Sequence, residues 1–598
     1  DARRSFEERK RLFQLARSSW SDYDTALISE GGGVFSRNAK SIVISPQMQK
    51  RFGIAEARLT PTALIQALLK AEVDLLWMGG IGTYIKSSQE THMDVGDKAN
   101  DALRVDADDL RCKVVGEGGN LGVTQLARTE FALNGGRSNT DFIDNAGGVD
   151  CSDHEVNIKI LLDTIVARGD LTEKHRNALL EEMTESVAEL VLANNYRQVQ
   201  AISITEREAH SRSGEYRRLI TNLAERGRLD RELEFLPSDE VLAERRVQGR
   251  GLTRPELAVL ISYSKAILKE ELIESDLGTD PYLSSAVATA FPASLVGRYA
   301  EDISEHRLQR EIMCTQVAND IVNRMGLNFM LRQRKATGAS IADVARAYTA
   351  VMEIFELRQL WRDIELLDCQ VDAHIQIEMM LDVVRLVKRA TRWLLRNRRH
   401  NIAPTLTIAE FGEGARHLRT RLPEMLRGDA AERHVERSRY YQDAGVGEAI
   451  AERVAACLHS FTALAIVDVA SLVAADLDDV ATLYYHLGER LELDWFGAQI
   501  LSSNVDNEWQ AMAREAYMED LQWQQCTLTQ GVLGQRCGET VDLVSCIESW
   551  EAQEQPLLQR WKDMLGELHS TTSPDFAMFA VANRELLDLA QSSRRSDG

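Results

Sequence analysis

Residues 113–120 of this chain are Lys113-Val114-Val115-Gly116-Glu117-Gly118-Gly119-Asn120, a short apolar run that passes directly into small residues. The valines favour a buried strand, and the glycines favour a tight turn after it. Two further strand candidates, Val73–Met78 and Asn139–Ile143, are also followed at once by small residues, which are Gly79-Gly80-Ile81-Gly82 and Asp144-Asn145-Ala146-Gly147-Gly148. With the helical pattern of Val123–Leu133 between them, these runs predict an α/β domain.

A parallel arrangement of these strands would gather their loops at one place. Right-handed crossovers put every following loop on the carboxyl edge of a parallel sheet, where open α/β folds bind ligands. Glycine suits such an edge because it adopts positive φ and lets a backbone approach a flat ring or a phosphate. The sequence therefore predicts a partial Rossmann-like domain with a parallel sheet in residues 1–165.

Helical periodicity replaces the glycine turns from about residue 155 onward. One helix begins with a predicted capping box at Thr253-Arg254-Pro255-Glu256. Another has an apolar face that includes Ile377 and Met380, and a second face with Arg385, Arg389, Arg392 and Arg396. We expect this basic stripe to be solvated or salt-bridged, with a subunit contact as the alternative. Residues 166–598 are predicted to be a large all-α region of two or three helical subdomains.

Composition and charge are those of a soluble globular protein, with 44% apolar and 27% charged residues. The 92 acidic and 70 basic residues give a formal charge of −22, which would repel nucleic acid and anionic membranes. The eight cysteines form no CxxC pair, so we expect no metal site and reduced thiols in the cytoplasm.

Neither a membrane span nor a targeting signal is predicted. The apolar stretch Ala455–Ala475 is interrupted by His459 and Asp468, which favours a buried soluble helix. Asp1 is preceded by no initiator methionine and begins no signal pattern, so we interpret it as a cut in a longer chain.

Short catalytic motifs are of little help in this sequence. It contains no HExxH, GxSxG or Walker A pattern, and Gly116, Gly118 and Gly122 form GxGxxxG rather than the dinucleotide fingerprint GxGxxG. The segment 141–155 is more informative, because Asn145 could bind a carboxamide or a ribose hydroxyl. The structural alternative, in which its Asn and Asp residues turn the chain and cap a helix, is equally compatible with the residues alone.

Longer blocks carry a resemblance to a known family. Residues 114–120, Asn145-Ala146-Gly147-Gly148-Val149 and Ser152–Glu155 resemble, in order and spacing, the end of the nucleotide domain of glutamate dehydrogenases. Residues 28–37, 79–84, 151–160, 251–260, 322–326 and 389–393 resemble the large bacterial NAD-dependent branch. The resemblance extends over essentially the whole chain and suggests the carboxy-terminal portion of such an enzyme.

The resemblance implies NAD-dependent oxidative deamination of L-glutamate to 2-oxoglutarate and ammonia. It implies cofactor contacts from Gly79, Gly80, Gly118 and Gly119, with Asn120 beside the nicotinamide ribose and Asn145 on the carboxamide. Ser152 would contact the distal carboxylate of the substrate. Gly79-Gly80 replaces the family's Pro-Ala-Ala turn, and Gly119-Asn120-Leu121 replaces Ala-Asn-Gly.

The catalytic Lys and Asp of the family are expected upstream of this chain, so no catalytic residue is assigned here and the chain alone is expected to be inactive. The family pattern gives no catalytic role to Asp144, Asp150, Asp153 or His154, for which helix capping or ion pairing is expected. The helical region is expected to pack on the catalytic unit and to form a homo-oligomer. Two alternatives remain open: a non-enzymatic helical assembly module with a degenerate nucleotide-binding fold, and a dehydrogenase for another amino acid.

Overall fold

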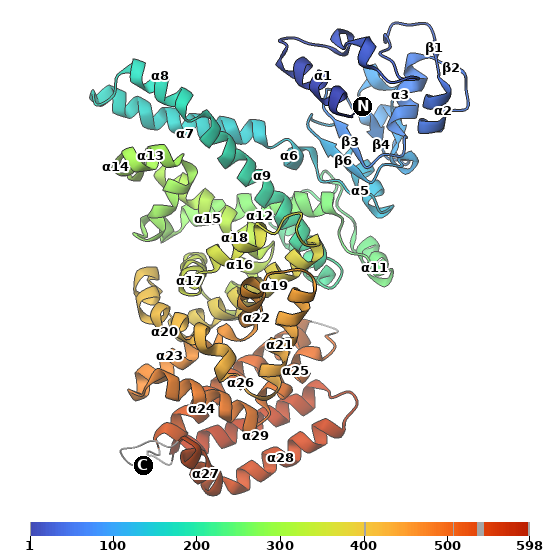
Figure 1. Ribbon diagram of the computed structural model, residues 1–598. Helices are drawn as coiled ribbons and strands as arrows, with labels where there is room; N and C mark the ends of the chain where they lie inside the picture. Colours follow the sequence, from blue (N-terminus) through green and yellow to red (C-terminus); the bar gives the residue numbers. More distant parts are fainter. Residues whose placement is uncertain (1, 400–401, 506–507, 535–542, 596–598) are drawn as a thin grey trace. The chain divides into compact units, whose positions relative to one another are not determined.

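The computed structural model describes residues 2–399, 402–505, 508–534 and 543–595. The chain forms two compact units, residues 1–328 and residues 329–598 (Figure 1). Across these described ranges, all β-strands belong to the first unit, and the second unit is built from helices.

The strands of the first unit are short and pair two by two. β3 (Leu75–Met78) and β6 (Val114–Glu117) are parallel, with Leu75 opposite Val114 and Met78 opposite Glu117. The other pairs are β4 (Ile85–Lys86) with β5 (Val105–Asp106), which is parallel, and β1 (Ile42–Val43) with β2 (Arg58–Leu59), which is antiparallel. The first unit therefore contains a small parallel sheet.

Two of the three predicted strands are confirmed, as β3 and β6. The strand predicted at Asn139–Ile143 is wrong, because residues 141–144 form the short helix α6 (Asp141–Asp144). The parallel partner of β6 on that side is instead a single bridge between Val114 and Arg137. The side chains of Asp144 and Asp141 explain the difference. They accept the backbone N–H groups of Glu117, the last residue of β6, and of Leu121 in the following loop, which turns the segment across the end of the strand.

The first unit also contains many helices. They are α1 (Ala2–Gln14), α2 (Pro46–Phe52), α3 (Pro61–Leu69), α4 (His92–Val95), α5 (Gln125–Leu133), α6, α7 (Gly147–Arg168), α8 (Glu173–Glu182), α9 (Thr184–Arg207), α10 (Ser213–Glu225), α11 (Asp239–Val247), α12 (Arg254–Glu274), α13 (Ala293–Arg298), α14 (Ala300–Ser304) and α15 (Gln309–Met325). Of these helices, α3, α5 and α6 contact the strands. The short 3-10 helices are Trp20–Asp22, Thr25–Leu27, Lys98–Asn100, Ala107–Asp109, Asp276–Thr279 and Leu283–Ala290.

The core around the sheet fixes α5 against the strands. Met78, Ile85, Val115 and Val123 pack with Phe131 of α5 in one buried cluster. The predicted helix at residues 123–133 is thus confirmed as α5, which follows β6 in the order expected of an α/β unit. The predicted capping box of α12 is confirmed too, since Glu256 Oε2 accepts the backbone N–H of Thr253 at 2.7 Å.

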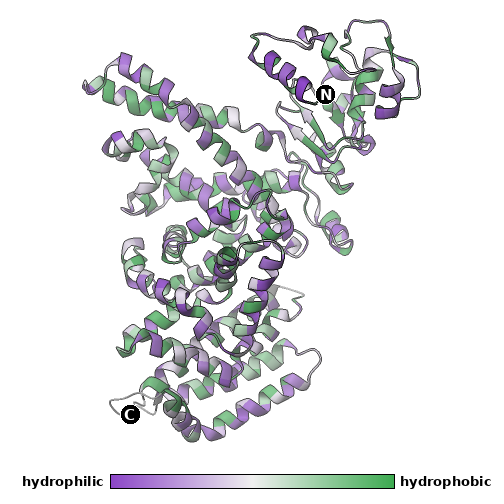
Figure 2. Ribbon diagram, in the orientation of Figure 1, coloured by the Kyte–Doolittle hydropathy of each residue, from purple (hydrophilic) through white to green (hydrophobic). Residues whose placement is uncertain are grey.

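The second unit consists of amphipathic helices, and Figure 2 shows hydrophilic and hydrophobic residues alternating along them. They are α16 (Phe329–Thr337), α17 (Ile341–Ile354), α18 (Leu357–Glu365), α19 (Ala373–Asn397), α20 (Pro404–Met425), α21 (Gly428–Asp443), α22 (Glu448–Ser460), α23 (Thr462–Val473), α24 (Leu477–Arg490), α25 (Leu493–Ser502), α26 (Glu508–Gly534), α27 (Leu543–Gln553), α28 (Gln555–Ser570) and α29 (Phe576–Arg595).

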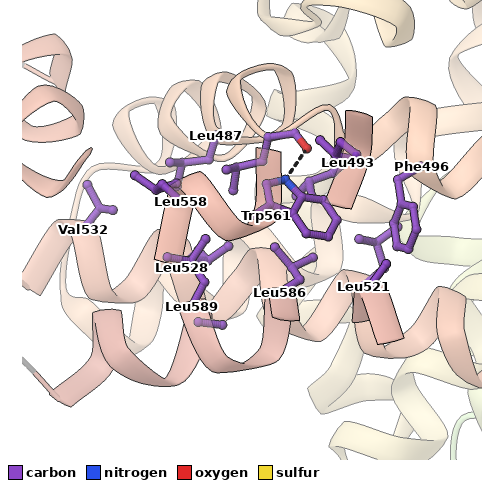
Figure 3. Close-up of a cluster of buried hydrophobic side chains, with 14 of the residues drawn as sticks. Leu487, Leu493, Phe496, Leu521, Leu528, Val532, Leu558, Trp561, Leu586 and Leu589 are labelled. Carbon is purple, nitrogen blue, oxygen red and sulfur yellow. Dashed lines mark hydrogen bonds between the residues drawn. The ribbon is translucent and has the colours of Figure 1, made fainter. Parts of the chain in front are cut away.

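A buried cluster joins the last helices of this unit. Phe496 of α25, Leu528 of α26 and Leu586 of α29 pack around Trp561 of α28 (Figure 3). The indole Nε1 of Trp561 donates a hydrogen bond to the Leu491 carbonyl at 3.0 Å, which satisfies the one polar group of this fully buried ring.

Among the described residues, no single helix is long and apolar enough to cross a membrane. By length and composition alone, α22 and α23 pass that test together, although they are bent by 58° at the break between them.

Candidate functional site

The two glycine loops that follow β3 and β6 touch each other. Because Met78 pairs with Glu117, both strands end at the same level of the sheet. The Gly119 N–H donates to the Met78 carbonyl at 2.9 Å, and a Cβ at position 119 would lie only 2.5 Å from the Gly80 carbonyl oxygen. This close approach of two backbones requires glycine at position 119.

Trp77 covers the glycines of β6. A Cβ at Gly118 would lie 2.5 Å from Cζ2 of the Trp77 ring, and one at Gly116 would lie 2.9 Å from its Cε3. The indole therefore lies against the backbone of the neighbouring strand, and its side chain is still 58% exposed. Trp77 was not predicted as a site residue, although a tryptophan two positions before a glycine pair was a usable signal.

The side chains of Asn120 and Asn145 meet. Nδ2 of Asn145 donates a hydrogen bond to Oδ1 of Asn120 at 2.6 Å, at an exposed position. Asn120 follows β6, and Asn145 is the residue at which α6 ends. The structure thus brings two of the predicted site residues together from segments 25 positions apart. An amide pair joined in this way retains one donor group on Asn120 and one acceptor on Asn145 for a ligand.

Acidic side chains hold these loops in place. Asp144 accepts the backbone N–H of Glu117 at 3.0 Å, and Asp141 accepts that of Leu121 at 2.8 Å. Leu121 has φ of 55°, a left-handed conformation that is uncommon for a residue with a Cβ. The Asp141 contact supports that conformation at the position where the resemblance leads one to expect glycine.

A buried ion pair lies directly beneath the second loop. Glu117 and Arg128 are 1% and 3% exposed, and the carboxylate accepts from Nε of Arg128 at 2.6 Å and from Nη2 at 2.9 Å. Glu117 also accepts the N–H of Val123 at 3.0 Å, so one carboxylate fixes both ends of the loop. Burial raises the pKa of Glu117, against the lowering effect of Arg128.

Asp144 and the other polar residues around Asn145 have structural partners. Burial raises the pKa of Asp144, which also accepts a hydrogen bond from Asn139 at 2.8 Å. Asp150 accepts Nδ2 of Asn194 at 2.9 Å, and Nδ1 of His154 lies 2.9 Å from the Ala290 carbonyl. Helix capping or ion pairing was expected for Asp144, Asp150 and His154. The structure gives them hydrogen bonds to neighbouring amides and a carbonyl, and Asp150 Oδ1 also lies 3.8 Å from His154 Nε2, within ion-pair distance.

Ser152 lies on the second turn of α7, seven positions after Asn145 and exposed. Its hydroxyl donates to the Gly148 carbonyl of its own helix at 3.2 Å. Such a bond is weak enough to be exchanged for one to a ligand. Among the described residues, no group of three or more His, Cys, Asp or Glu side chains is placed to hold a metal ion; Cys537 falls outside those residues.

Known proteins match this chain from end to end. The family described as "Glutamate dehydrogenase, C-terminal" matches residues 249–588, and "Bacterial NAD-glutamate dehydrogenase, catalytic domain" matches residues 1–205. The chain belongs to the bacterial NAD-specific glutamate dehydrogenase family. The candidate site, from Gly79 to Ser152, lies inside the segment that matches the catalytic domain of this family.

Three curated relatives carry the printed name NAD-specific glutamate dehydrogenase. The chain is 55% identical over 594 residues to that of Pseudomonas aeruginosa, 50% identical over 593 residues to that of Halomonas elongata, and 40% identical over 603 residues to that of Mycobacterium tuberculosis. The matches cover 99%, 99% and 100% of this chain, and 37% of each relative. The chain therefore spans about 37% of the length of these glutamate dehydrogenases.

Some residues that shape the candidate site were not found by sequence reasoning. Glu117, Arg128 and Asp141 form a connected group, since Arg128 also lies 3.2 Å from Asp141. The helical spacing of Arg128 on α5 gives no hint of this group, because its partners come from β6 and α6.

Proposed function

We propose that this chain takes part in the NAD-dependent oxidative deamination of L-glutamate to 2-oxoglutarate and ammonia, as a portion of a longer enzyme. The observation that carries the proposal is the Asn120–Asn145 amide pair beside the glycine loops, within the segment that matches the catalytic domain. The family membership and the names of the relatives support the same reaction.

The geometry of the loops fits a nicotinamide cofactor. The free carbonyl oxygen of Asn145 can accept a hydrogen bond from the NH2 group of a carboxamide, and the free amide N–H of Asn120 can donate one to a ribose hydroxyl. Nothing lies within 4 Å of a Cβ position at Gly80, so a flat ring could approach the backbone there. NAD supplies the acceptor for hydride from the amino-acid Cα. The role of the chain is to orient the ring, with Asn145 on the carboxamide and Asn120 at the ribose, because orientation accounts for much of such catalysis.

Ser152 is proposed to bind the distal carboxylate of glutamate. Its hydroxyl is exposed near the beginning of α7, where helix amides and the helix dipole favour an anion. A substrate without a distal carboxylate would not use this contact. No residue of the chain is proposed as general acid or base, and the Lys and Asp with that role are proposed to lie upstream.

Residues 1–165 are proposed to form the second half of a Rossmann-like NAD-binding domain, and residues 166–598 a helical region of two or three subdomains that assembles the homo-oligomer in the cytoplasm. The exposure of one face of the parallel β3–β6 pair supports the proposal for residues 1–165. Leu75 and Trp77 on that face are 54% and 58% exposed. Parallel sheets are normally covered on both faces, so further chain is expected to cover these residues in the longer enzyme.

The proposal is tested by NAD binding and by NADH absorbance with glutamate. The 598-residue chain alone is expected to turn over no glutamate, and the longer enzyme is expected to form NADH. In that enzyme, Asn145→Ala should lower kcat/KM by about tenfold to a hundredfold, as loss of one or two orienting hydrogen bonds predicts. Asn38→Ala, at an exposed position outside the site, is the matched control.

Three outcomes would contradict the proposal. Equal kcat/KM for Asn145→Ala and the unaltered enzyme would remove the role of the amide pair. A protein that never responds to NAD in any form would favour a non-enzymatic helical assembly module with a degenerate nucleotide-binding fold. Turnover of leucine or phenylalanine in preference to glutamate would instead favour another amino-acid dehydrogenase and would exclude the role of Ser152.

A further inference from the structure

The second unit contains a cavity of about 950 Å³. Its wall is formed by residues of α16, α19, α22, α23, α25, α26 and α29, all between positions 329 and 594. Sites for small organic ligands have volumes of roughly 300–1,000 Å³. The cavity is therefore large enough for a whole small molecule, and its residues are separate from the proposed cofactor residues, which all belong to the first unit.

Positive charge dominates this wall although the whole chain carries a formal charge of −22. The described lining residues include nine basic side chains and four acidic ones. The basic residues are Arg332, Arg385, Lys388, Arg389, Arg392, Arg396, Arg399, Arg514 and Arg594. An excess of cations inside a concave, partly desolvated surface attracts anions more strongly than the same charges would on an open surface.

Three of the four acidic lining residues are already engaged by arginines, and the first of them, Asp468, accepts a hydrogen bond from Arg398. Glu515 accepts hydrogen bonds from Arg332 and from Nη1 of Arg392, the latter at 2.8 Å. Glu519 pairs with Arg396 and lies 3.4 Å from Arg392. The carboxylates from α26 thus neutralise part of the basic stripe of α19 and do not neutralise Arg389.

Arg389 differs from Arg392 and Arg396 because its guanidinium lies on an aromatic ring and not against a carboxylate of α26. Its guanidinium carbon lies 3.3 Å from the centre of the Phe461 ring, and it lines the cavity with its side chain exposed there. Within the described ranges, no carboxylate or carbonyl lies within hydrogen-bond distance of it. Protein surrounds the group, and this desolvation lowers the pKa of Arg389 to about 10. Asp494 acts on Arg389 only from beyond ion-pair distance, so a bound anion would supply a direct partner and stabilise the charged form of Arg389.

The remaining wall is apolar and partly aromatic. Trp523, Leu472 and Leu501 line the cavity and are 47%, 68% and 54% exposed, so their apolar surface is available to a ligand. Trp393 lines it as well. An inorganic anion would contact only the arginines and would leave this apolar surface exposed to water.

We propose that the cavity is a binding site for an amphiphilic organic anion, whose carboxylate or phosphate contacts Arg389 and whose apolar or aromatic body lies against Trp523 and Leu472. The arginines supply directional, charge-assisted hydrogen bonds, and Phe461 holds the Arg389 guanidinium by a cation–π contact. The proposal does not depend on the reaction proposed for the first unit, because it uses residues of the second unit only.

Isothermal titration calorimetry on the 598-residue chain tests it. Two probes are used: AMP, which is a phosphate with an aromatic group, and octanoate, which is a carboxylate with an aliphatic chain. They distinguish an aromatic from an aliphatic ligand. Adenosine and octanol are their uncharged counterparts, and inorganic phosphate is an anion without an apolar group. We expect AMP or octanoate to bind, and each uncharged counterpart and phosphate to bind at least about tenfold more weakly, which corresponds to about 1.4 kcal/mol.

Variants connect the binding to Arg389. Arg389→Gln should raise the Kd of the bound probe by about tenfold or more, because a charge-assisted bond in a desolvated site is lost. Leu472→Asp should weaken binding by adding a negative charge at an exposed lining position. Arg439→Gln, at an exposed position of α21 outside the cavity, should leave the Kd unchanged.

Other results would overturn the proposal. It fails if neither AMP nor octanoate binds, or if inorganic phosphate binds as tightly as they do. It also fails if Arg389→Gln and Leu472→Asp both fold, as judged by an unchanged thermal midpoint, and both bind the probe as tightly as the unaltered chain.

Discussion

Replacing Arg128 by Met tests whether the buried ion pair with Glu117 holds the second glycine loop. The carboxylate of Glu117 accepts two hydrogen bonds from Arg128 and one from the Val123 N–H. Arg128→Met removes the first two and leaves the third. Methionine has an unbranched side chain that fills most of the same space, so the change acts mainly on charge and hydrogen bonding.

The size of the effect follows from the burial of Glu117, which is 1% exposed. Breaking a buried ion pair by removing one partner costs about 3–5 kcal/mol, because the other charge stays desolvated. Without Arg128, the raised pKa of Glu117 will rise further, so the folded state will retain a proton that the unfolded state has lost. The unfolding free energy of the variant should therefore fall as pH rises above 4.5, and its deficit should be smaller at pH 5 than at pH 8.

Hydrogen exchange of residues 118–124, followed by mass spectrometry on the 598-residue chain, measures this effect locally. Local exchange avoids assuming that a chain with two compact units unfolds in one step. We expect faster exchange in Arg128→Met and a partial return toward the original rate in Arg128→Met combined with Glu117→Gln, which removes the stranded charge. Lys113→Met breaks the exposed pair with Asp74 and should leave exchange unchanged.

A loss below about 1 kcal/mol for Arg128→Met would refute the reasoning, since it would place the pair in the range of surface ion pairs. A double variant less stable than Arg128→Met would refute it as well. In that case the cost would come from lost packing around position 128 and not from the uncompensated carboxylate of Glu117.

Three further predictions concern other parts of the fold. Gly119→Ala should lower the thermal stability by about 1–3 kcal/mol because its Cβ would meet the Gly80 carbonyl, whereas Gly80→Ala, whose Cβ meets nothing within 4 Å, should not. Burial lowers the pKa of Lys265 from 10.5 to about 7, so Lys265→Met should stabilise the chain by about 3–5 kcal/mol below pH 7. This gain should shrink between pH 7 and 10.5, where the lysine is neutral in the folded chain. A gain that stays constant in thermal scans over this pH range would contradict the prediction. Trp561→Phe should cost about 2–3 kcal/mol in denaturant unfolding through loss of its bond to Leu491 and of buried volume, and an unchanged midpoint would contradict the role of that bond.

The elements that the sequence predicted well are those decided by neighbouring residues. β3 and β6 combine apolar residues with glycines that follow immediately, and the capping box of α12 is complete within four residues. The strand predicted at Asn139–Ile143 fails for the opposite reason. Its conformation depends on hydrogen bonds that Asp141 and Asp144 accept from backbone N–H groups 20 and 27 positions away.

The basic stripe of α19 shows the same limit in the second unit. A salt-bridged stripe was predicted, and this is confirmed for Arg385, Arg392 and Arg396, which pair with Asp382, Glu515 and Glu519. Helical spacing places the four arginines on one face, so the sequence pattern gives no basis for distinguishing them. They differ because α26 brings carboxylates to two of them, Asp382 of α19 itself pairs with Arg385, and Phe461 lies at Arg389. A periodic pattern can therefore predict a charged face, while the charge that remains available to a ligand depends on which helix packs opposite it.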